Sequence, residues 1–228
     1  MSREIYITLS GACGAWAELE RIGNDIANAQ TAGYKSERLT YKSVGPTKGH
    51  EVYSTLTGVA IDKTDGARIA DGVDTHMALQ GPGYFSVDDG KGGVLLTRDG
   101  RFQRDSAGRL TDLHGKAVLG VNGPIVLPPG PITVGRDGTI SGVDGTVAKL
   151  RLLDGPTRGV GGSHWVATGA MTPSTATVEG GVIEASTVDA ASSMVELIQA
   201  GRAFEAFQKA MQTSDEMDER LIRAGGPQ

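Results

Sequence analysis

The two ends of the chain share a hydrophobic pattern that the middle lacks. Near the start, apolar or small residues recur at alternating intervals of four and three, which is the a/d seam of an α-helix that packs against a partner. The stripe consists of Ile5, Leu9, Ala12, Trp16, Leu19, Gly23 and Ile26. Gly33 can adopt a left-handed conformation, so we expect this helix to end between Asn28 and Ala32.

The far end repeats the pattern. Its stripe consists of Leu197, Ala200, Phe204, Phe207, Met211, Ser214 and Leu221. Ser186 or Thr187 is predicted to cap this second helix, and residues 225–227, Gly-Gly-Pro, to end it. An isolated helix with a modest apolar face is only marginally stable in water, so both stripes are expected to need partners. The predicted assembly interface is therefore Ile5, Leu9, Trp16, Leu19, Ile26, Leu197, Phe204, Phe207 and Met211.

Between the helices the helical period gives way to short runs typical of strands. Such runs occur at Tyr84–Val87, Val94–Thr97 and Lys149–Leu153, separated by glycine-rich turns. Asp-Gly pairs at 99–100 and 137–138 indicate hairpins, for which we expect type I′ turns with positive φ at both central residues. The middle of the chain is therefore predicted to be mainly β.

These patterns predict an α+β fold with three parts. Residues 1–34 and 186–228 are expected to pair as a coiled-coil-like helical assembly domain. Residues 35–75 carry a weak pattern and are expected to be an extended linker, and residues 76–185 a central β-rich domain. The 34 glycines and only 9 prolines fit many tight turns between short strands.

The charge and the cysteine content of the chain limit the classes of function that it can have. The formal net charge is -5, and neither sign forms a long run, which disfavours a nucleic-acid partner. Cys13 is the only cysteine, so no intramolecular disulfide can form. Leu9–Cys13 loosely resembles a lipoprotein cleavage box, but the apolar run before it is too short for a signal peptide. We expect no cleavable signal peptide and no transmembrane segment.

Candidate chemistry is sparse. His50, His76, His114 and His164 are isolated in sequence, without the spacing of a metal site. The glycine-rich runs at 90–93 and 159–163 lack the Gly-Lys-Ser/Thr sequence of a phosphate-binding loop. We therefore expect no catalytic residues, no cofactor and no metal, and a protein that is not an enzyme.

A specific motif lies where the first helix is predicted to end. Residues 24–35 resemble the Ala-Asn-x-x-Thr-x-Gly-[Phe/Tyr]-[Lys/Arg] signature near the start of flagellar rod and hook proteins. The matching residues are Ala27, Asn28, Thr31, Gly33, Tyr34 and Lys35. Three further blocks, at 78–87, 97–102 and 194–205, resemble the same family and occur in the family's order.

The resemblance implies a structural subunit of the flagellar rod, the drive shaft that crosses the periplasm. It implies export by the flagellar type III apparatus and polymerisation through the terminal helices with itself and other rod proteins, both proximal and distal. The length and the opening residues 3–12 are most similar to the proximal-rod type, with the distal-rod type as the alternative. Two other classes stay open from the residues alone: an enzyme acting on peptidoglycan, and a chaperone or soluble binding module.

Overall fold

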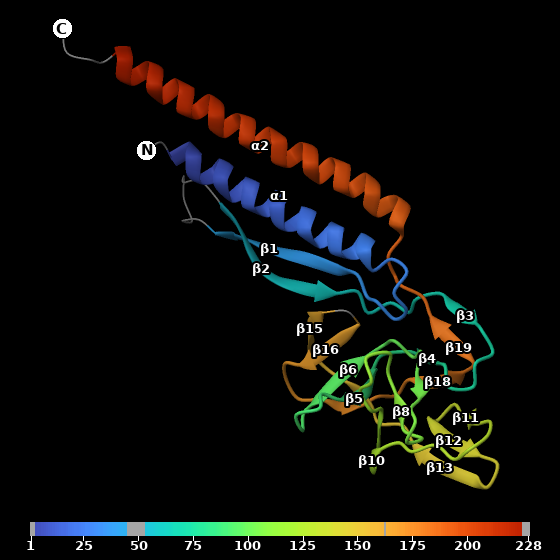
Figure 1. Ribbon diagram of the computed structural model, residues 1–228. Coiled ribbons are helices and arrows are strands. Elements are labelled where there is room, and N and C mark those ends of the chain that lie inside the picture. Colours follow the sequence, from blue (N-terminus) through green and yellow to red (C-terminus); the bar gives the residue numbers. More distant parts are fainter. Residues whose placement is uncertain (1–2, 45–52, 162, 225–228) are drawn as a thin grey trace. The chain divides into compact units, whose positions relative to one another are not determined.

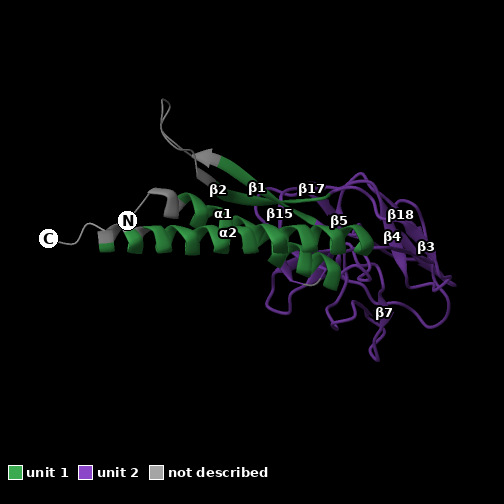
Figure 2. Cartoon of the chain, turned by 90° about the horizontal axis from the view of Figure 1, so that it is seen from above, with its two compact units in different colours: residues 1–27, 37–62, 189–228 green, residues 28–36, 63–188 purple. Residues whose placement is uncertain are grey.

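The computed structural model describes residues 3–44, 53–161 and 163–224 of the 228-residue chain (Figure 1). The fold contains two long helices and many strands, so the predicted α+β class is confirmed. The chain divides into two compact units (Figure 2). We call residues 1–27, 37–62 and 189–228 the terminal unit, and residues 28–36 and 63–188 the central unit.

The terminal unit contains α1 (Arg3–Ala27), α2 (Ala190–Ala224) and an antiparallel hairpin of β1 (Glu37–Val44) and β2 (Tyr53–Ile61). The two helices lie side by side, and both hairpin strands contact α1. The Tyr41 hydroxyl donates a hydrogen bond to the Gly14 carbonyl of α1 at 3.3 Å. Much of the segment that we expected to be an extended linker is therefore a paired hairpin, because its strands satisfy each other's backbone groups.

A capping residue sets the start of α2. The cap of α2 is Asp189, which accepts hydrogen bonds from the Ala191 backbone N–H and the Ser192 hydroxyl. The predicted caps were wrong: Ser186 bonds to the N–H of Val188, and Thr187 accepts the N–H of Ser36. Residues 225–227, predicted to end α2, lie outside the described residues.

The central unit is built from short, mostly antiparallel strands. Their bounds are β3 (Arg68–Ala70), β4 (Met77–Gln80), β5 (Tyr84–Asp88), β6 (Val94–Thr97), β7 (Gln103–Arg104), β8 (Leu110–Thr111), β9 (Leu119–Gly120), β10 (Gly123–Pro124), β11 (Thr133–Val134), β12 (Thr139–Gly142), β13 (Gly145–Lys149), β14 (Leu152–Asp154), β15 (Thr157–Gly161), β16 (His164–Ala167), β17 (Thr172–Pro173), β18 (Thr177–Gly180) and β19 (Val182–Glu184). The largest sheet has six strands in the order β15-β16-β6-β5-β14-β17, and β11, β12 and β13 form a second sheet.

One apolar cluster forms the core of the central unit. Phe85 and Phe102 meet edge to face at its centre, with ring centroids 5.1 Å apart. Met77, Leu79 and Leu110 are also fully buried there. Alternate residues of β5 and its neighbours supply this cluster, which follows from the two-residue period of strands.

Several turns of the central unit use one five-residue design. At 89–93, 105–109 and 112–116 an aspartate opens the turn and its Oδ1 accepts the N–H groups of the third and fifth residues. The fourth residue is a glycine with positive φ, namely Gly92, Gly108 and Gly115. Within the described residues no non-glycine has positive φ, so the expected type I′ turns at the Asp-Gly pairs were wrong.

Candidate functional site

The two terminal helices meet along a line of small and aromatic residues. The ring of Phe207 packs over Gly11, so close that a Cβ at Gly11 would lie 2.4 Å from it. Further along, the rings of Trp16 and Phe204 lie 5.7 Å apart at a 52° angle. Gly11 therefore meets Phe207, and the later residue Trp16 meets the earlier residue Phe204. This order shows that the two helices run antiparallel.

The predicted interface residues divide between this contact and solvent. On α2, half-buried side chains occur at Leu197, Phe204, Phe207 and Met211. On α1, the side chains of Leu19 and Ile26 are half-buried, whereas those of Leu9 and Trp16 are 47% and 58% exposed. The side chain of Ile5 lies outside the described residues.

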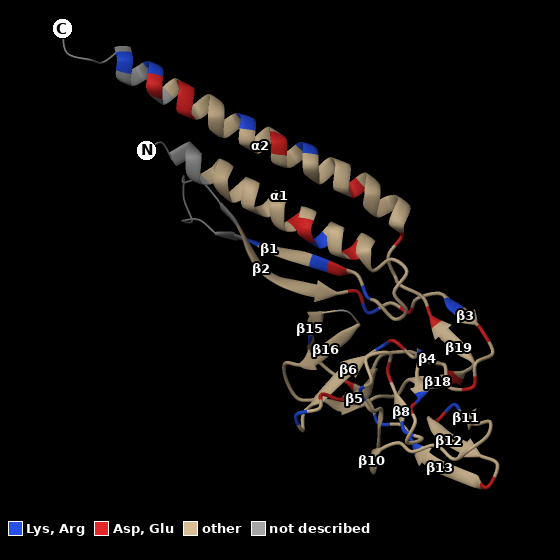
Figure 3. Cartoon of the chain, viewed as in Figure 1, with Lys and Arg blue, Asp and Glu red and all other residues tan. Residues whose placement is uncertain are grey.

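A set of apolar side chains stays uncovered on the terminal helices. The exposed large apolar residues of the described parts of α1 and α2 are Leu9, Trp16, Met194, Val195, Ile198 and Met217. In addition, α1 carries no charged residue between positions 7 and 17 (Figure 3). We call these six residues the apolar helix surface.

The signature motif closes α1 and enters the central unit. The Thr31 N–H donates to the Asn28 carbonyl, and Gly33 follows with φ of 66°, as the sequence predicted. Gly33 lies against the backbone of Arg98, where a Cβ would approach within 2.3 Å. Tyr34 and Lys35 are both buried. The motif is therefore a packed structural element of the central unit as well as a helix stop.

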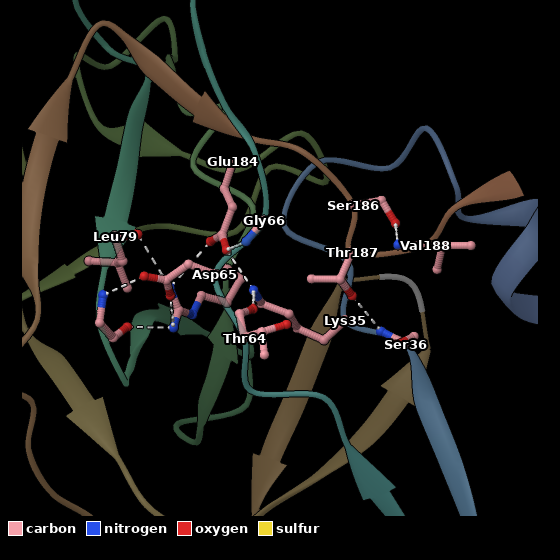
Figure 4. Close-up of polar contacts among 12 residues, drawn as sticks. Lys35, Ser36, Thr64, Asp65, Gly66, Leu79, Glu184, Ser186, Thr187 and Val188 are labelled. Carbon is pink, nitrogen blue, oxygen red and sulfur yellow. Dashed lines mark hydrogen bonds and ion pairs between the residues drawn. The ribbon is translucent and has the colours of Figure 1, made fainter.

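The buried Lys35 leads to a group of charges that we call the ion-pair node: Lys35, Arg98 and Glu184. Figure 4 shows Lys35 and Glu184 pointing toward each other. The Nζ of Lys35 lies 2.5 Å from Oε1 of Glu184, and Nη1 of Arg98 lies 3.2 Å from Oε2. All three side chains are at most 3% exposed. The node joins the signature motif, the block at 97–102 and β19.

Backbone groups complete the node. Lys35 donates to the Thr64 carbonyl, Arg98 donates to the Gly81 carbonyl at 2.6 Å, and the Gly66 N–H donates to Glu184. Removing one partner of such a buried pair typically costs about 3–5 kcal/mol, because an uncompensated charge stays behind. Glu184 was missed in the sequence because nothing local marks it.

The structure also brings together residues that look isolated in the sequence. His164 Nε2 lies 2.8 Å from Asp112 Oδ2, and His114 Nδ1 lies 3.8 Å from the same oxygen. The two imidazole rings meet edge to face, 5.2 Å apart. Burial alone would raise the pKa of Asp112, but hydrogen bonds from His164 and from the Lys116 and His114 backbone outweigh it and lower the pKa.

The two remaining histidines are His76 and His50. His76 forms a single pair with Asp71, with 2.6 Å between Nδ1 and Oδ2, and His50 lies outside the described residues. His76, His114 and His164, which are isolated in the sequence, each have an aspartate neighbour in the structure. None of the described helices is both long and apolar enough to cross a membrane.

Comparison with known proteins is consistent along the whole chain. Residues 78–142 match the family described as flagellar hook protein FlgE/F/G D1 domain, and residues 179–224 match the flagellar basal body rod FlgEFG protein C-terminal family. The chain is 32% identical to the flagellar basal-body rod protein FlgF of Caulobacter vibrioides, over 99% of both chains. It is 29% identical to the flagellar basal-body rod protein FlgG of Bacillus subtilis, over 97% of this chain and 98% of that one.

Proposed function

The chain belongs to the family of flagellar basal-body rod proteins, and we propose that its apolar helix surface joins it to neighbouring subunits of the rod. The observation that carries this proposal is the exposure of six large apolar side chains on α1 and α2. Three of them, Met194, Val195 and Ile198, are spaced as neighbours on one face of α2, and an exposed apolar group of this kind is typical of a protein interface. In an assembled rod, neighbouring subunits would cover this surface and form a coiled-coil-like bundle with the terminal helices.

We propose that the contacts between subunits are open and head-to-tail, so that they build a tube. Surfaces that do not close on themselves generate helical filaments, which is the architecture that a drive shaft requires. We propose that the subunit transmits torque within a rod that crosses the periplasm, and that it reaches the rod through the flagellar export apparatus. Its partners would be copies of itself and other rod proteins.

Within the family we propose the proximal-rod FlgF type, with the FlgG type as the alternative. Alignments to FlgF proteins extend over 241 to 248 positions, close to the 228 residues of this chain. Alignments to FlgG proteins are longer, at 253 to 267 positions, so they need more insertions. Family membership also favours a structural role over the enzyme and chaperone hypotheses that the residues alone left open.

The proposal is tested by placing a charge on the apolar helix surface. Ile198 is 58% exposed, so Ile198→Asp should leave the purified monomer folded. In an assembled rod the new carboxylate would be buried without a partner, which is costly. We expect loss of swimming and loss of the subunit from isolated basal bodies when the variant is the only copy.

The matched control is Val143→Asp, an equally apolar and 76% exposed position in the central unit. It should leave swimming unchanged. Circular dichroism of both purified monomers checks that neither change unfolds the chain. Normal rods containing Ile198→Asp would remove α2 from the proposed interface.

A further inference from the structure

We propose that Asp112, His114 and His164 form a binding site for a divalent transition-metal ion, with Zn²⁺ as the ion that suits these ligands. The three side chains offer one ligand atom each, and these atoms all lie within 4.8 Å of one another. It is the one such group of three among the described residues. Imidazole nitrogen and carboxylate oxygen are both ligands that Zn²⁺ binds in proteins.

The spacing is close to that of a metal site. With bonds of about 2.0–2.1 Å, the ligands of a tetrahedral zinc ion lie about 3.3 Å apart. The distances from Asp112 Oδ2 to the two histidine nitrogens, 2.8 Å and 3.8 Å, lie on either side of this value. The contact to His114 is too long for a hydrogen bond, and the ligand nitrogens of the two histidines lie within 4.8 Å of each other.

Asp112 is held ready to coordinate by its own turn. Its Oδ1 accepts the backbone N–H groups of His114 and Lys116, both at 2.8 Å, which leaves Oδ2 facing the histidines. Hydrogen bonds of this kind orient a ligating carboxylate. The Nζ of Lys116 turns away to the Asp89 carbonyl, so this cation does not compete for the carboxylate.

Two ligands of the site are buried and the third is exposed to solvent. The side chains of Asp112 and His164 are 7% and 9% exposed, whereas His114 is 62% exposed. An ion can therefore reach the site from the side of His114, and water can fill the remaining coordination position. Nitrogen ligands disfavour Ca²⁺ and Mg²⁺, which prefer oxygen.

A bound ion would connect parts of the central unit that are distant in sequence. Asp112 and His114 belong to the turn after β8, and His164 begins β16. The ion would act as a cross-link in a chain whose single cysteine cannot form an internal disulfide. An ion that binds only the folded state raises the midpoint of thermal unfolding, by roughly 5–10 °C at a hundredfold excess over Kd.

Calorimetric titration of the full chain with ZnCl₂, without a histidine tag, tests the site. We expect one ion per chain, a raised unfolding temperature, and no comparable binding of Ca²⁺. Because His114 is exposed, His114→Ala should fold normally and weaken Zn²⁺ binding at least roughly tenfold. Asp112→Asn keeps an oxygen for the turn but removes the carboxylate, and it should weaken binding as well.

The matched control is His76→Ala, which removes the histidine of the Asp71 pair, a pair without a third ligand. Its Zn²⁺ affinity should equal that of the parent. Cobalt provides a spectroscopic check, since a Co²⁺ ion held by histidine gains visible absorption that His114→Ala should reduce. Absence of saturable Zn²⁺ binding, or equal affinity in His114→Ala and the parent, would overturn the proposal.

Discussion

Gly33 occupies a position where two independent constraints exclude a side chain. Its φ of 66° disfavours any residue with a Cβ, and the Arg98 carbonyl carbon lies 2.3 Å from where that Cβ would be. Left-handed backbone alone costs roughly 1–2 kcal/mol for an L-residue. The close approach adds to this cost because the neighbouring atoms belong to the backbone and cannot rotate away. The requirement for glycine in the signature motif therefore comes from both its backbone conformation and packing within the central unit.

We predict that Gly33→Ala lowers the free energy of unfolding of the central unit by about 3 kcal/mol. The control is Gly72→Ala, which has φ of 71° but no atom within 4 Å of its Cβ, and it should cost only about 1 kcal/mol. Urea unfolding can be followed by fluorescence of the buried Trp165 in a Trp16→Phe background. Equal losses in the two variants would mean that the contact with Arg98 is not a constraint.

At the scale of elements, the helix pair depends on a small residue facing a large one. Gly11 weakens α1 in isolation, since glycine inside a helix is less favourable than alanine by about 0.5–1 kcal/mol. Its benefit is that the ring of Phe207 can approach the α1 backbone. Gly23 lies in the same helix, and nothing lies within 4 Å of its Cβ. Substitutions at these two glycines therefore distinguish the effect of helix propensity from the effect of packing between the helices.

We expect opposite effects from the same substitution at these two positions. Gly23→Ala should stabilise α1 by about 0.5–1 kcal/mol through helix propensity. Gly11→Ala should instead destabilise the helix pair by about 1 kcal/mol or more, because the ring of Phe207 must shift. Thermal melts monitored by far-ultraviolet circular dichroism measure both changes. Stabilisation by Gly11→Ala would show that the Phe207 contact contributes little.

At the scale of the whole molecule, the two units differ in how many apolar side chains they bury. The only buried apolar side chains in the described part of the terminal unit are Ala12 and Ile22. The central unit has a continuous cluster that includes Met77, Phe85 and Leu110. A unit with few buried contacts opens at lower free energy. The difference suits a subunit whose ends gain their stability on assembly.

Hydrogen exchange of a verified monomer checks this difference. The backbone amides of α1 and α2 should exchange through openings of clearly lower free energy than those of β4 and β5. On incorporation into rods the helix amides should become protected, because the proposed interface would place neighbouring subunits on the apolar helix surface. Equal protection of α2 and β5 in the monomer would contradict the expectation.

The sequence by itself determined the features that depend on neighbouring residues. The helical period placed Leu197, Phe204 and Phe207 on one face of α2, and Gly33 was identified as a left-handed helix stop because no other residue adopts that conformation freely. The strands β5 and β6 and the family signature were equally readable, whereas the predicted run Lys149–Leu153 is divided between β13 and β14. All of these are local preferences of the backbone, or a repeat along one element.

Only the tertiary structure decided which distant groups meet. Glu184 joins Lys35 across 149 residues, His164 joins Asp112 across 52, and the hairpin of β1 and β2 replaces the expected linker. No local pattern encodes these pairings, because a buried charge or an unpaired strand can be satisfied by any suitable partner that the fold brings near. The ion-pair node and the candidate metal site were for this reason invisible until the chain was folded.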